Sequence, residues 1–211
     1  MAKHVDYYVS LNSPWTYLGS KRFEAMAQKH GADVTIWPVD FGSVFAVSGG
    51  LPLPKRAPQR QAYRMMELKR WRDHLGVKTT LEPKFFPANE VPAAKCVIAL
   101  REQGRMADAI KVAHAVLAAL WAEEKNTGDP ATLQAIIAGC GLDAAAVIKA
   151  SEAPAIAEKR ETYTKQAIEK GVFGKDAASG LNAGQFLTGW AKPVDVKIGR
   201  ASCRERVYVL V

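Results

Sequence analysis

The sequence predicts an α/β fold in which a βαβ unit is followed by a large all-helical segment. Two apolar, strand-like runs at 5–11 and 33–39 flank one amphipathic helix, and the patterned segments from 59 to 170 have helical spacing. Two strands joined by a crossover helix pair in parallel. A two-stranded sheet is not stable alone, so we expect a later part of the chain to supply more strands.

The first helix is predicted over 15–30. Ser13 suits its N-cap, Pro14 its first position, and Gly31 ends it. A helix N-terminus offers unpaired N–H groups and the positive end of the helix dipole, so it can bind an anion. Capping alone also explains a Ser-Pro pair, and a purely structural Ser13 is therefore the alternative interpretation.

The Gly- and Pro-rich stretch 48–58 is predicted to be a loop that leads out of the β-containing half. Some six helices follow it. Gly76 and Gly171 end the first and the last of them, and Asp129 caps the one that begins with Pro130. Besides the helix that begins with Pro130, the predicted helices are 59–75, 92–103, 106–124, 143–150 and 154–170.

Composition excludes several classes of protein. No apolar run is long enough to span a membrane, and no apolar signal region opens the chain, so we expect a cytoplasmic protein without a membrane partner. The net charge of +8 comes with mixed signs and no nucleic-acid motif. It favours small anions such as carboxylates over nucleic acid. The three cysteines form no metal-ligand pattern, so we expect no metal: Cys96, Cys140 and Cys203.

The strand-to-helix junction is the most informative feature. Thioredoxin-like proteins carry a Cys-x-x-Cys motif there. Here the four residues are Ser13, Pro14, Trp15 and Thr16, so hydroxyls stand where both sulfurs would be. This argues against a DsbA-like thiol-disulfide oxidoreductase. A thiol used at this junction has to come from a ligand.

Four motifs together carry a family resemblance: SPWTYL at 13–18, KFFPAN at 84–89, WAEE at 121–124 and GVFG at 171–174. In this order they resemble the 2-hydroxychromene-2-carboxylate isomerase family, which is related to kappa-class glutathione transferases. Both belong to the DsbA-like branch of the thioredoxin superfamily. The resemblance covers about residues 4 to 174. It implies a thioredoxin-like fold with an inserted helical domain, and an enzyme of aromatic-compound catabolism.

The resemblance also implies glutathione as the thiol, with Ser13 as the catalytic residue beside its sulfur. A thiol of pKa about 8.5 is a weak nucleophile at neutral pH, and a helix N-terminus with a hydroxyl donor lowers that pKa. The thiolate would add reversibly to the conjugated double bond of an unsaturated ketoacid or a related small electrophile. Ser13 would stabilise the sulfur charge and would not itself attack.

Four more residues are candidates for binding glutathione or substrate. Lys55, Arg56 and Arg60 lie in or just after the Pro-rich loop, and the resemblance places this region over the active site. Arg recognises carboxylates well. The alternative is a solvated basic loop. Asn89 resembles a residue near the substrate, and its alternative is an ordinary turn Asn.

The aromatic residues and histidines are assigned mostly to structure. We expect Trp71 and Trp121 in the core, whereas Trp15 either lines the pocket or joins the core. We expect no general base among the histidines, which lack paired carboxylates: His30, His74 and His114. A position that is usually basic in the characterised isomerases aligns near Phe45, and this leaves the natural substrate open.

Besides the position near Phe45, the sequence departs from the family pattern after Gly174. The resemblance implies a Val-Pro pair with a cis proline directly after this residue. No proline occurs before Pro193, and we hypothesise a frameshift or chimeric join. Residues 198–207 resemble the translation of a sequencing-adapter oligonucleotide. The predicted parts are 1–48 and 171–197 of the thioredoxin-like domain, the helical insertion 49–170, and a non-native tail 198–211.

The alternative to an active enzyme is a truncated protein that is inactive or binds its ligand weakly. Related enzymes are often dimers, so a homodimer is compatible with the sequence.

Overall fold

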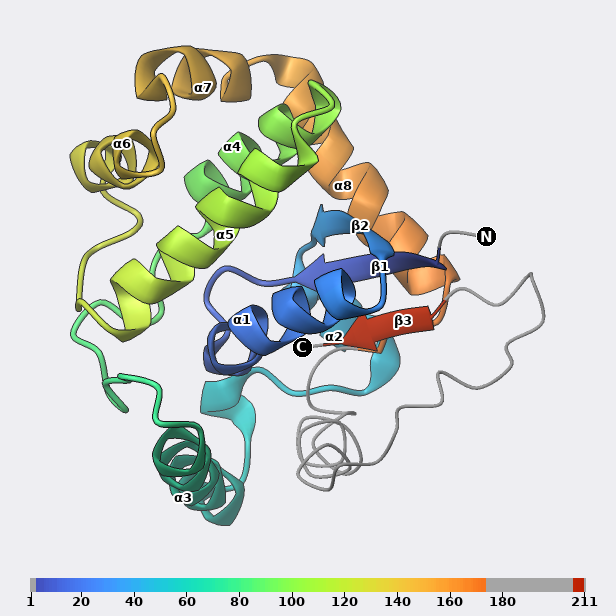
Figure 1. Ribbon diagram of the computed structural model, residues 1–211. Coiled ribbons are helices and arrows are strands. Elements are labelled where there is room, and N and C mark those ends of the chain that lie inside the picture. Colours follow the sequence, from blue (N-terminus) through green and yellow to red (C-terminus); the bar gives the residue numbers. More distant parts are fainter. Residues whose placement is uncertain (1–2, 174–206, 211) are drawn as a thin grey trace.

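The structure, a computed structural model, describes residues 3–173 and 207–210. Strand β1 (Lys3–Val9) leads into helix α1 (Pro14–Lys29), which returns to strand β2 (Ala32–Pro38). The two strands are parallel and pair along their whole length, as Figure 1 shows. The predicted βαβ unit is therefore confirmed.

The predicted need for more strands is met by β3 (Val207–Leu210), which pairs in parallel with β1 and gives the sheet order β2-β1-β3. This strand lies inside the segment that we expected to be a non-native tail. Strand pairing does not test where the tail comes from, so its origin stays a prediction. The predicted join near Gly174, the cis-proline departure and residues 198–206 lie outside the described residues.

Local sequence signals place the helix ends. Ser13 is the N-cap of α1, and Gly31 follows its last turn with a left-handed φ of 56°. Asp129 caps α6 through the Thr132 N–H. The helices after the loop begin and end within a few residues of their predicted bounds: α3 Pro58–Leu75, α4 Val91–Glu102, α5 Met106–Trp121, α6 Pro130–Gly139, α7 Ala144–Ser151 and α8 Pro154–Glu169.

Two boundaries differ from the prediction. Helix α2 (Phe41–Ser48) had no predicted counterpart, because eight residues with one uninterrupted apolar run show no helical period. Its N-cap is Asp40, which accepts the Gly42 N–H at 2.9 Å. Helix α5 ends at Trp121 and does not reach residue 124, and Glu124 takes a left-handed φ of 54° that a helix could not continue through. A short 3-10 turn (Leu53–Lys55) lies inside the predicted loop.

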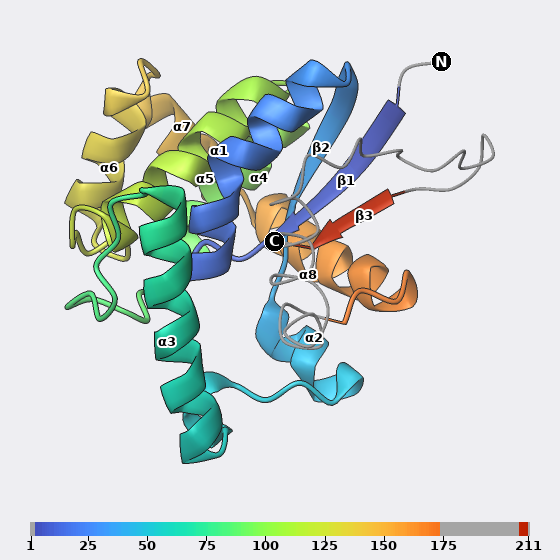
Figure 2. The ribbon, with the colours of Figure 1, turned by 60° about the horizontal axis from the view of Figure 1, so that its bottom comes forward.

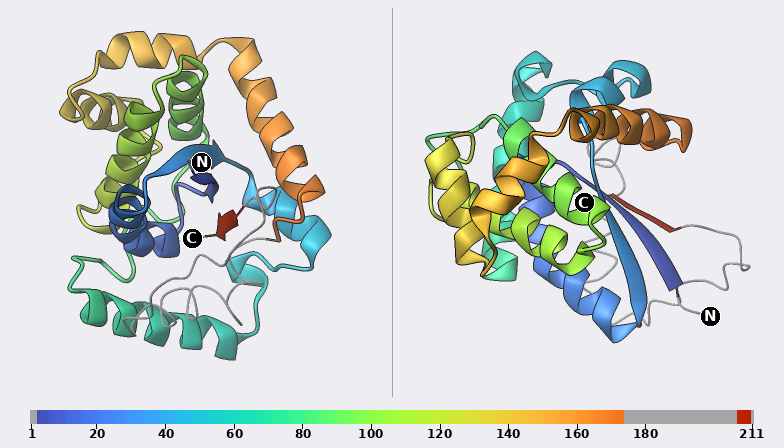
Figure 3. Two further views of the ribbon diagram at one scale, coloured as in Figure 1. Left: turned by 45° about the vertical axis from the view of Figure 1, so that its right-hand side comes forward. Right: turned by 90° about the horizontal axis from the view of Figure 1, so that it is seen from above.

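Helices cover both faces of the small sheet, and Figures 1 and 3 show α1 and α8 on opposite sides of it. Tyr7 and Tyr8 are neighbours in β1 and both are 0 % exposed, because successive side chains of a strand point to opposite faces. Tyr7 joins the core formed with α1, α4 and α5, whereas Tyr8 joins the core formed with α2 and α8. Among the described residues, no helix combines the length and the apolar character that a membrane span needs.

Helix α3 stands away from the sheet, as Figure 2 shows, and packs on α1. Leu68 of α3 is 0 % exposed and fills the contact with Trp15 and Leu18 of α1. Its burial fixes the second half of α3 beside the first turns of α1. The helical segment is thereby attached directly to the helix whose N-terminus carries the candidate site.

Candidate functional site

Ser13 lies in the turn between β1 and α1, and its hydroxyl caps the N-terminus of α1. Its Oγ accepts the Thr16 N–H at 3.2 Å, and its carbonyl accepts the Tyr17 N–H at 3.0 Å. Its own N–H donates to the Ser10 carbonyl at 3.2 Å. The predicted cap is confirmed. Ser13 is only 1 % exposed, so a ligand thiol reaches this hydroxyl only when a neighbouring group gives way.

Glu90, which sequence reasoning missed, holds the loop that carries Ser13. One of its oxygens, Oε2, accepts the Ser10 hydroxyl at 2.8 Å and the Asn12 N–H at 3.1 Å. The other, Oε1, accepts Arg160 Nη2 of α8 at 3.3 Å. Both ends of this ion pair are mostly buried. One carboxylate therefore ties the junction, the start of α4 and helix α8 together.

Asn12 fixes the junction to the 84–89 loop through two further bonds. Its Nδ2 donates to the Ala88 carbonyl at 2.8 Å, and its Oδ1 accepts the Ala88 N–H at 3.1 Å. The loop includes a cis Phe86–Pro87 peptide bond. An amide that bonds both backbone groups of one residue behaves like a neighbouring strand, so the loop lies firmly against the β1–α1 turn.

Asn89 sits in this loop and is exposed. Its Oδ1 accepts the Val91 N–H at 3.1 Å, which is the bond of an ordinary Asx turn. A side chain added at Gly128 would meet the Asn89 backbone at 3.1 Å, so the two segments pack closely. The structure thus shows the structural role of Asn89, and its substrate role stays a prediction.

The three predicted basic residues lie where the chain enters α3. Lys55 and Arg60 are exposed, and Arg56 is half-buried with its Nε donating to the Leu51 carbonyl at 2.8 Å. Figure 2 shows that this end of α3 is the one farther from α1. The role of these side chains as carboxylate ligands stays a prediction.

Arg64 of α3 points toward the protein interior. It was not identified as a candidate from the sequence, because an Arg on a helix is usually exposed to solvent. It is 8 % exposed, and its guanidinium carbon lies 5.6 Å from the centre of the Phe86 ring. Phe86 in turn lies 4.9 Å from Trp121. A cation over an aromatic face is favourable. Arg64 therefore belongs to the same packed assembly as the loop that Asn12 holds.

The aromatic residues singled out from the sequence make packing contacts. Trp121 is 0 % exposed, which confirms its expected place in the core, whereas Trp71 is only partly buried and packs at the edge of the α1–α3 contact. Trp15, at 5 % exposure, belongs to that contact as well, which resolves its two alternatives in favour of the core. Phe45 is buried and packs beside Phe41 with their ring centres 6.1 Å apart.

One expectation about the histidines is corrected. We expected no paired carboxylate for His114, but its Nδ1 lies 3.7 Å from Glu24 Oε2, because α1 and α5 pack side by side. Burial lowers the pKa of His114 and outweighs Glu24, which raises it. His114 is therefore a neutral core histidine near pH 7. No cluster of metal-ligating side chains occurs among the residues that the structure describes.

Comparisons with known proteins agree with this fold. The 2-hydroxychromene-2-carboxylate isomerase of Pseudomonas putida is 28% identical over 172 residues, which cover 81% of each chain. The enzyme of the same name from Sphingobium xenophagum is 26% identical over 176 residues, covering 82% of this chain and 87% of that one. A solved 2-hydroxychromene-2-carboxylate isomerase superposes with a TM-score of 0.66 at 27% identity, covering 81% and 82% of the two chains.

The family match defines the extent of the resemblance. The family described as the DSBA-like thioredoxin domain matches residues 4–175. This range confirms the coverage that the four sequence motifs indicated, including its end near Gly174. The match covers most of the chain and includes the Ser13 junction and strands β1 and β2, whereas β3 lies beyond it. The chain belongs to the DSBA-like thioredoxin domain family.

Proposed function

We propose that this protein is an isomerase of the 2-hydroxychromene-2-carboxylate type, acting on an unsaturated ketoacid or a related electrophile with glutathione as its thiol. Two lines of support converge. The relatives that bear this name align over four fifths of the chain. The single observation that carries the proposal is the Ser13 hydroxyl at the N-cap of α1, where dithiol relatives of the fold hold a cysteine.

The junction suits a thiolate. Ser13 Oγ accepts the Thr16 N–H, so the hydroxyl hydrogen is the atom that can donate to a sulfur anion. The positive end of the α1 dipole stabilises the same charge. Glutathione bound here supplies a thiolate that adds reversibly to a conjugated double bond. Ser13 holds the sulfur charged, and the Asn12 and Glu90 contacts keep the junction in place while the substrate rotates.

The substrate and glutathione both carry carboxylates, so the proposed site needs cations. Lys55, Arg56 and Arg60 are the candidates from sequence, and Arg64 is added by its inward position beside Phe86. To test these four residues, each is replaced by alanine in a separate variant, and KM is measured for glutathione and for the substrate. Replacing a cation that binds a carboxylate should raise KM for that ligand about tenfold or more, since a hydrogen bond to a charged group contributes roughly 1.5–3 kcal/mol.

The burial of Ser13 favours a second candidate, a protein that has kept the fold but binds glutathione weakly or not at all. At 1 % exposure the hydroxyl has little open surface for a thiol. The two candidates differ in one measurable property. An isomerase must bind glutathione at Ser13 before any electrophile is tested.

Calorimetry with glutathione on the parent chain, Ser13→Ala and Ser20→Ala separates them. Ser20 is a matched control, because it is another buried serine of α1, and its hydroxyl bonds the Tyr17 carbonyl. We expect binding by the parent and Ser20→Ala, weakened tenfold or more in Ser13→Ala. Circular dichroism checks folding, since removing the cap costs about 1 kcal/mol. Unchanged binding in Ser13→Ala would remove Ser13 from the mechanism. No binding by the folded parent would establish the second candidate.

A further inference from the structure

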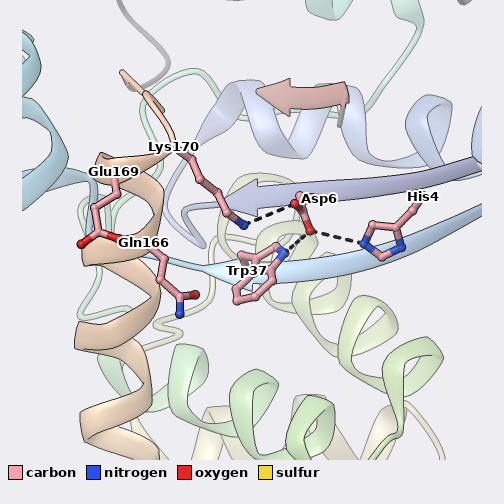
Figure 4. A pocket seen from close by; sticks show the side chains of 6 residues that line it. All are labelled: His4, Asp6, Trp37, Gln166, Glu169 and Lys170. Carbon is pink, nitrogen blue, oxygen red and sulfur yellow. Dashed lines mark hydrogen bonds and ion pairs between the residues drawn. The ribbon is translucent and has the colours of Figure 1, made fainter. Parts of the chain in front are cut away.

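A pocket of about 410 Å³ opens on the face of the sheet that α8 covers. Figure 4 shows side chains from β1, β2 and α8 meeting there. Lys170, just past the end of α8, and Trp37 of β2 both point toward the carboxylate of Asp6 in β1. His4 approaches the same carboxylate from the N-terminal side of β1. The remaining lining residues come from α8: Gln166 and Glu169.

Asp6 is the buried charge at the bottom of this pocket, at 3 % exposure. Its Oδ1 accepts the Trp37 indole N–H at 2.8 Å and lies 3.4 Å from His4 Nε2. Its Oδ2 has no hydrogen-bond donor among the described residues, although Lys170 Nζ lies 3.5 Å away as an ion pair. Buried carboxylate oxygens are normally hydrogen-bonded, so this oxygen is suited to a donor from a ligand.

The opposite charge is available in the same pocket. Lys170 Nζ lies 3.3 Å from the Tyr8 hydroxyl and 5.1 Å from the centre of the Trp37 ring, so its ammonium stays over the pocket. Figure 4 shows the Gln166 amide directed toward Trp37 from the neighbouring turn of α8. An ammonium and an amide are both donors, and together they can bind a carboxylate.

The paired charges of Asp6 and Lys170 disfavour a ligand that carries a single charge. A plain anion placed at Lys170 would face the buried Asp6 carboxylate, and a plain cation placed at Asp6 would face the Lys170 ammonium. Both oppositions are costly beside a carboxylate as buried as that of Asp6, where the effective dielectric constant is lower than in bulk water. A divalent metal is not supported, because the described residues hold no group of three metal-ligating side chains. What fits is a ligand that carries both charges on neighbouring atoms.

We infer that this pocket binds the head group of a small zwitterion, an α-amino acid, with its ammonium on Asp6 Oδ2 and its carboxylate on Lys170 and Gln166. The Lys170 side chain exchanges its contact with Asp6 for the carboxylate of the ligand. The site is separate from the Ser13 junction, since Asp6 lies three residues before the end of β1, roughly 10 Å along the strand. The inference is independent of the proposed isomerase function.

Glycine is the probe, because it has the head group without the thiol or the second carboxylate of glutathione. The ¹⁵N-labelled full chain is titrated with glycine, acetate and methylammonium at one ionic strength, and ¹H–¹⁵N spectra are recorded. The Trp37 indole N–H, assigned with Trp37→Phe, reports on Asp6. We expect a saturable shift of this signal and of the amides of 166–170 with glycine, and at least tenfold weaker binding of the other two.

Variants decide which groups bind. Lys170→Gln and Asp6→Asn should each weaken glycine binding at least about tenfold, as expected for a lost hydrogen bond between charged groups. Lys165→Gln, an exposed lysine of the same helix outside the pocket, should leave it unchanged. If Asp6→Asn does not fold, the glycine affinity of Lys170→Gln alone tests whether glycine binds in this pocket. Ser13→Ala should bind glycine like the parent, whatever its effect on glutathione.

Three results would overturn the inference: no saturable shift with glycine, equal affinity for acetate or methylammonium, or glycine binding that survives Lys170→Gln. A glycine response at the Ser13, Trp15 and Thr16 amides in place of the α8 amides would assign the binding to the junction.

Discussion

Replacing Glu90 with alanine should loosen the junction that carries Ser13. Glu90 accepts the Ser10 hydroxyl at 2.8 Å and the Asn12 N–H at 3.1 Å, and it pairs with Arg160 at 3.3 Å. In Glu90→Ala, the Ser10 hydroxyl and the Arg160 guanidinium lose this acceptor, and the Asn12 N–H keeps only its longer bond to Ser10 Oγ at 3.3 Å. The β1–α1 loop then keeps only its contacts to the 84–89 loop and its own turn.

The size of the effect follows from these three contacts. A hydrogen bond to a charged group contributes roughly 1.5–3 kcal/mol, and a solvated ion pair at most about 1 kcal/mol. The Glu90 and Arg160 side chains are 16% and 17% exposed, so water replaces part of what is lost. We therefore expect Glu90→Ala to lower the free energy of unfolding by about 2–4 kcal/mol, and Glu90→Gln by about half as much because the amide oxygen still accepts a bond.

Urea denaturation measures the free energy of unfolding, and hydrogen exchange measures the local effect. The Asn12 amide donates directly to Glu90, so its exchange should accelerate at least tenfold in Glu90→Ala, while amides in the middle of α5 change only as global stability does. Glu82→Ala is the control, because Glu82 is exposed in the same connecting segment and its loss should stay within about 0.5 kcal/mol. Equal stability of Glu90→Ala and Glu82→Ala, with unchanged Asn12 protection, would refute this reasoning.

Two further predictions concern ionisation. Ser13→Cys should give a thiol whose alkylation by iodoacetamide has its pH midpoint below about 8.5, because the α1 N-terminus favours the thiolate. The parent chain supplies the background, in which burial raises the pKa of Cys96 and Cys140, and a midpoint at or above 8.5 would contradict an anion-stabilising junction. Burial raises the pKa of Asp6, but the Trp37 N–H and the Lys170 charge outweigh it, so its pKa lies below the ordinary value. The stability contributed by Asp6 is therefore complete above the unfolded pKa of about 3.9 and is lost as the pH falls through the lower folded value. Urea unfolding between pH 5 and pH 2 should show a steeper loss in the parent than in Asp6→Asn, and parallel curves would disprove the role of Asp6.

The sequence predicted best what depends on neighbouring residues. The Ser13–Pro14 start of α1 and the Asp129–Pro130 start of α6 are complete within four residues, because a cap bonds an N–H of the first turn. The βαβ unit was predictable for the same reason, since its strands and helix carry their own periods. Helix α2 was missed because its eight residues contain too few turns to show a period.

The contacts of the candidate site were not predictable. Glu90 and Asn12 are separated by 78 residues, and no local pattern says that a carboxylate at the start of α4 reaches the end of β1. Arg64 reads as a surface residue of α3 until the packing of Leu68 on α1 turns its helix face inward. The prediction of Lys55, Arg56 and Arg60 as ligands rested on the resemblance, and the structure places them just before α3 and in its first turn.

By itself, then, the sequence determined the strand-to-helix junction with a hydroxyl in place of a thiol, because residues adjacent in the chain make that junction. It also determined a strand over 5–11, in which side chains alternate between the two faces. Only the tertiary structure decided that α8 covers one of these faces and buries Asp6 beside Lys170, 164 residues away. Burial and charge pairing depend on which distant surfaces meet, and the free energy of that choice is spread over the whole core, so no short stretch of sequence encodes it.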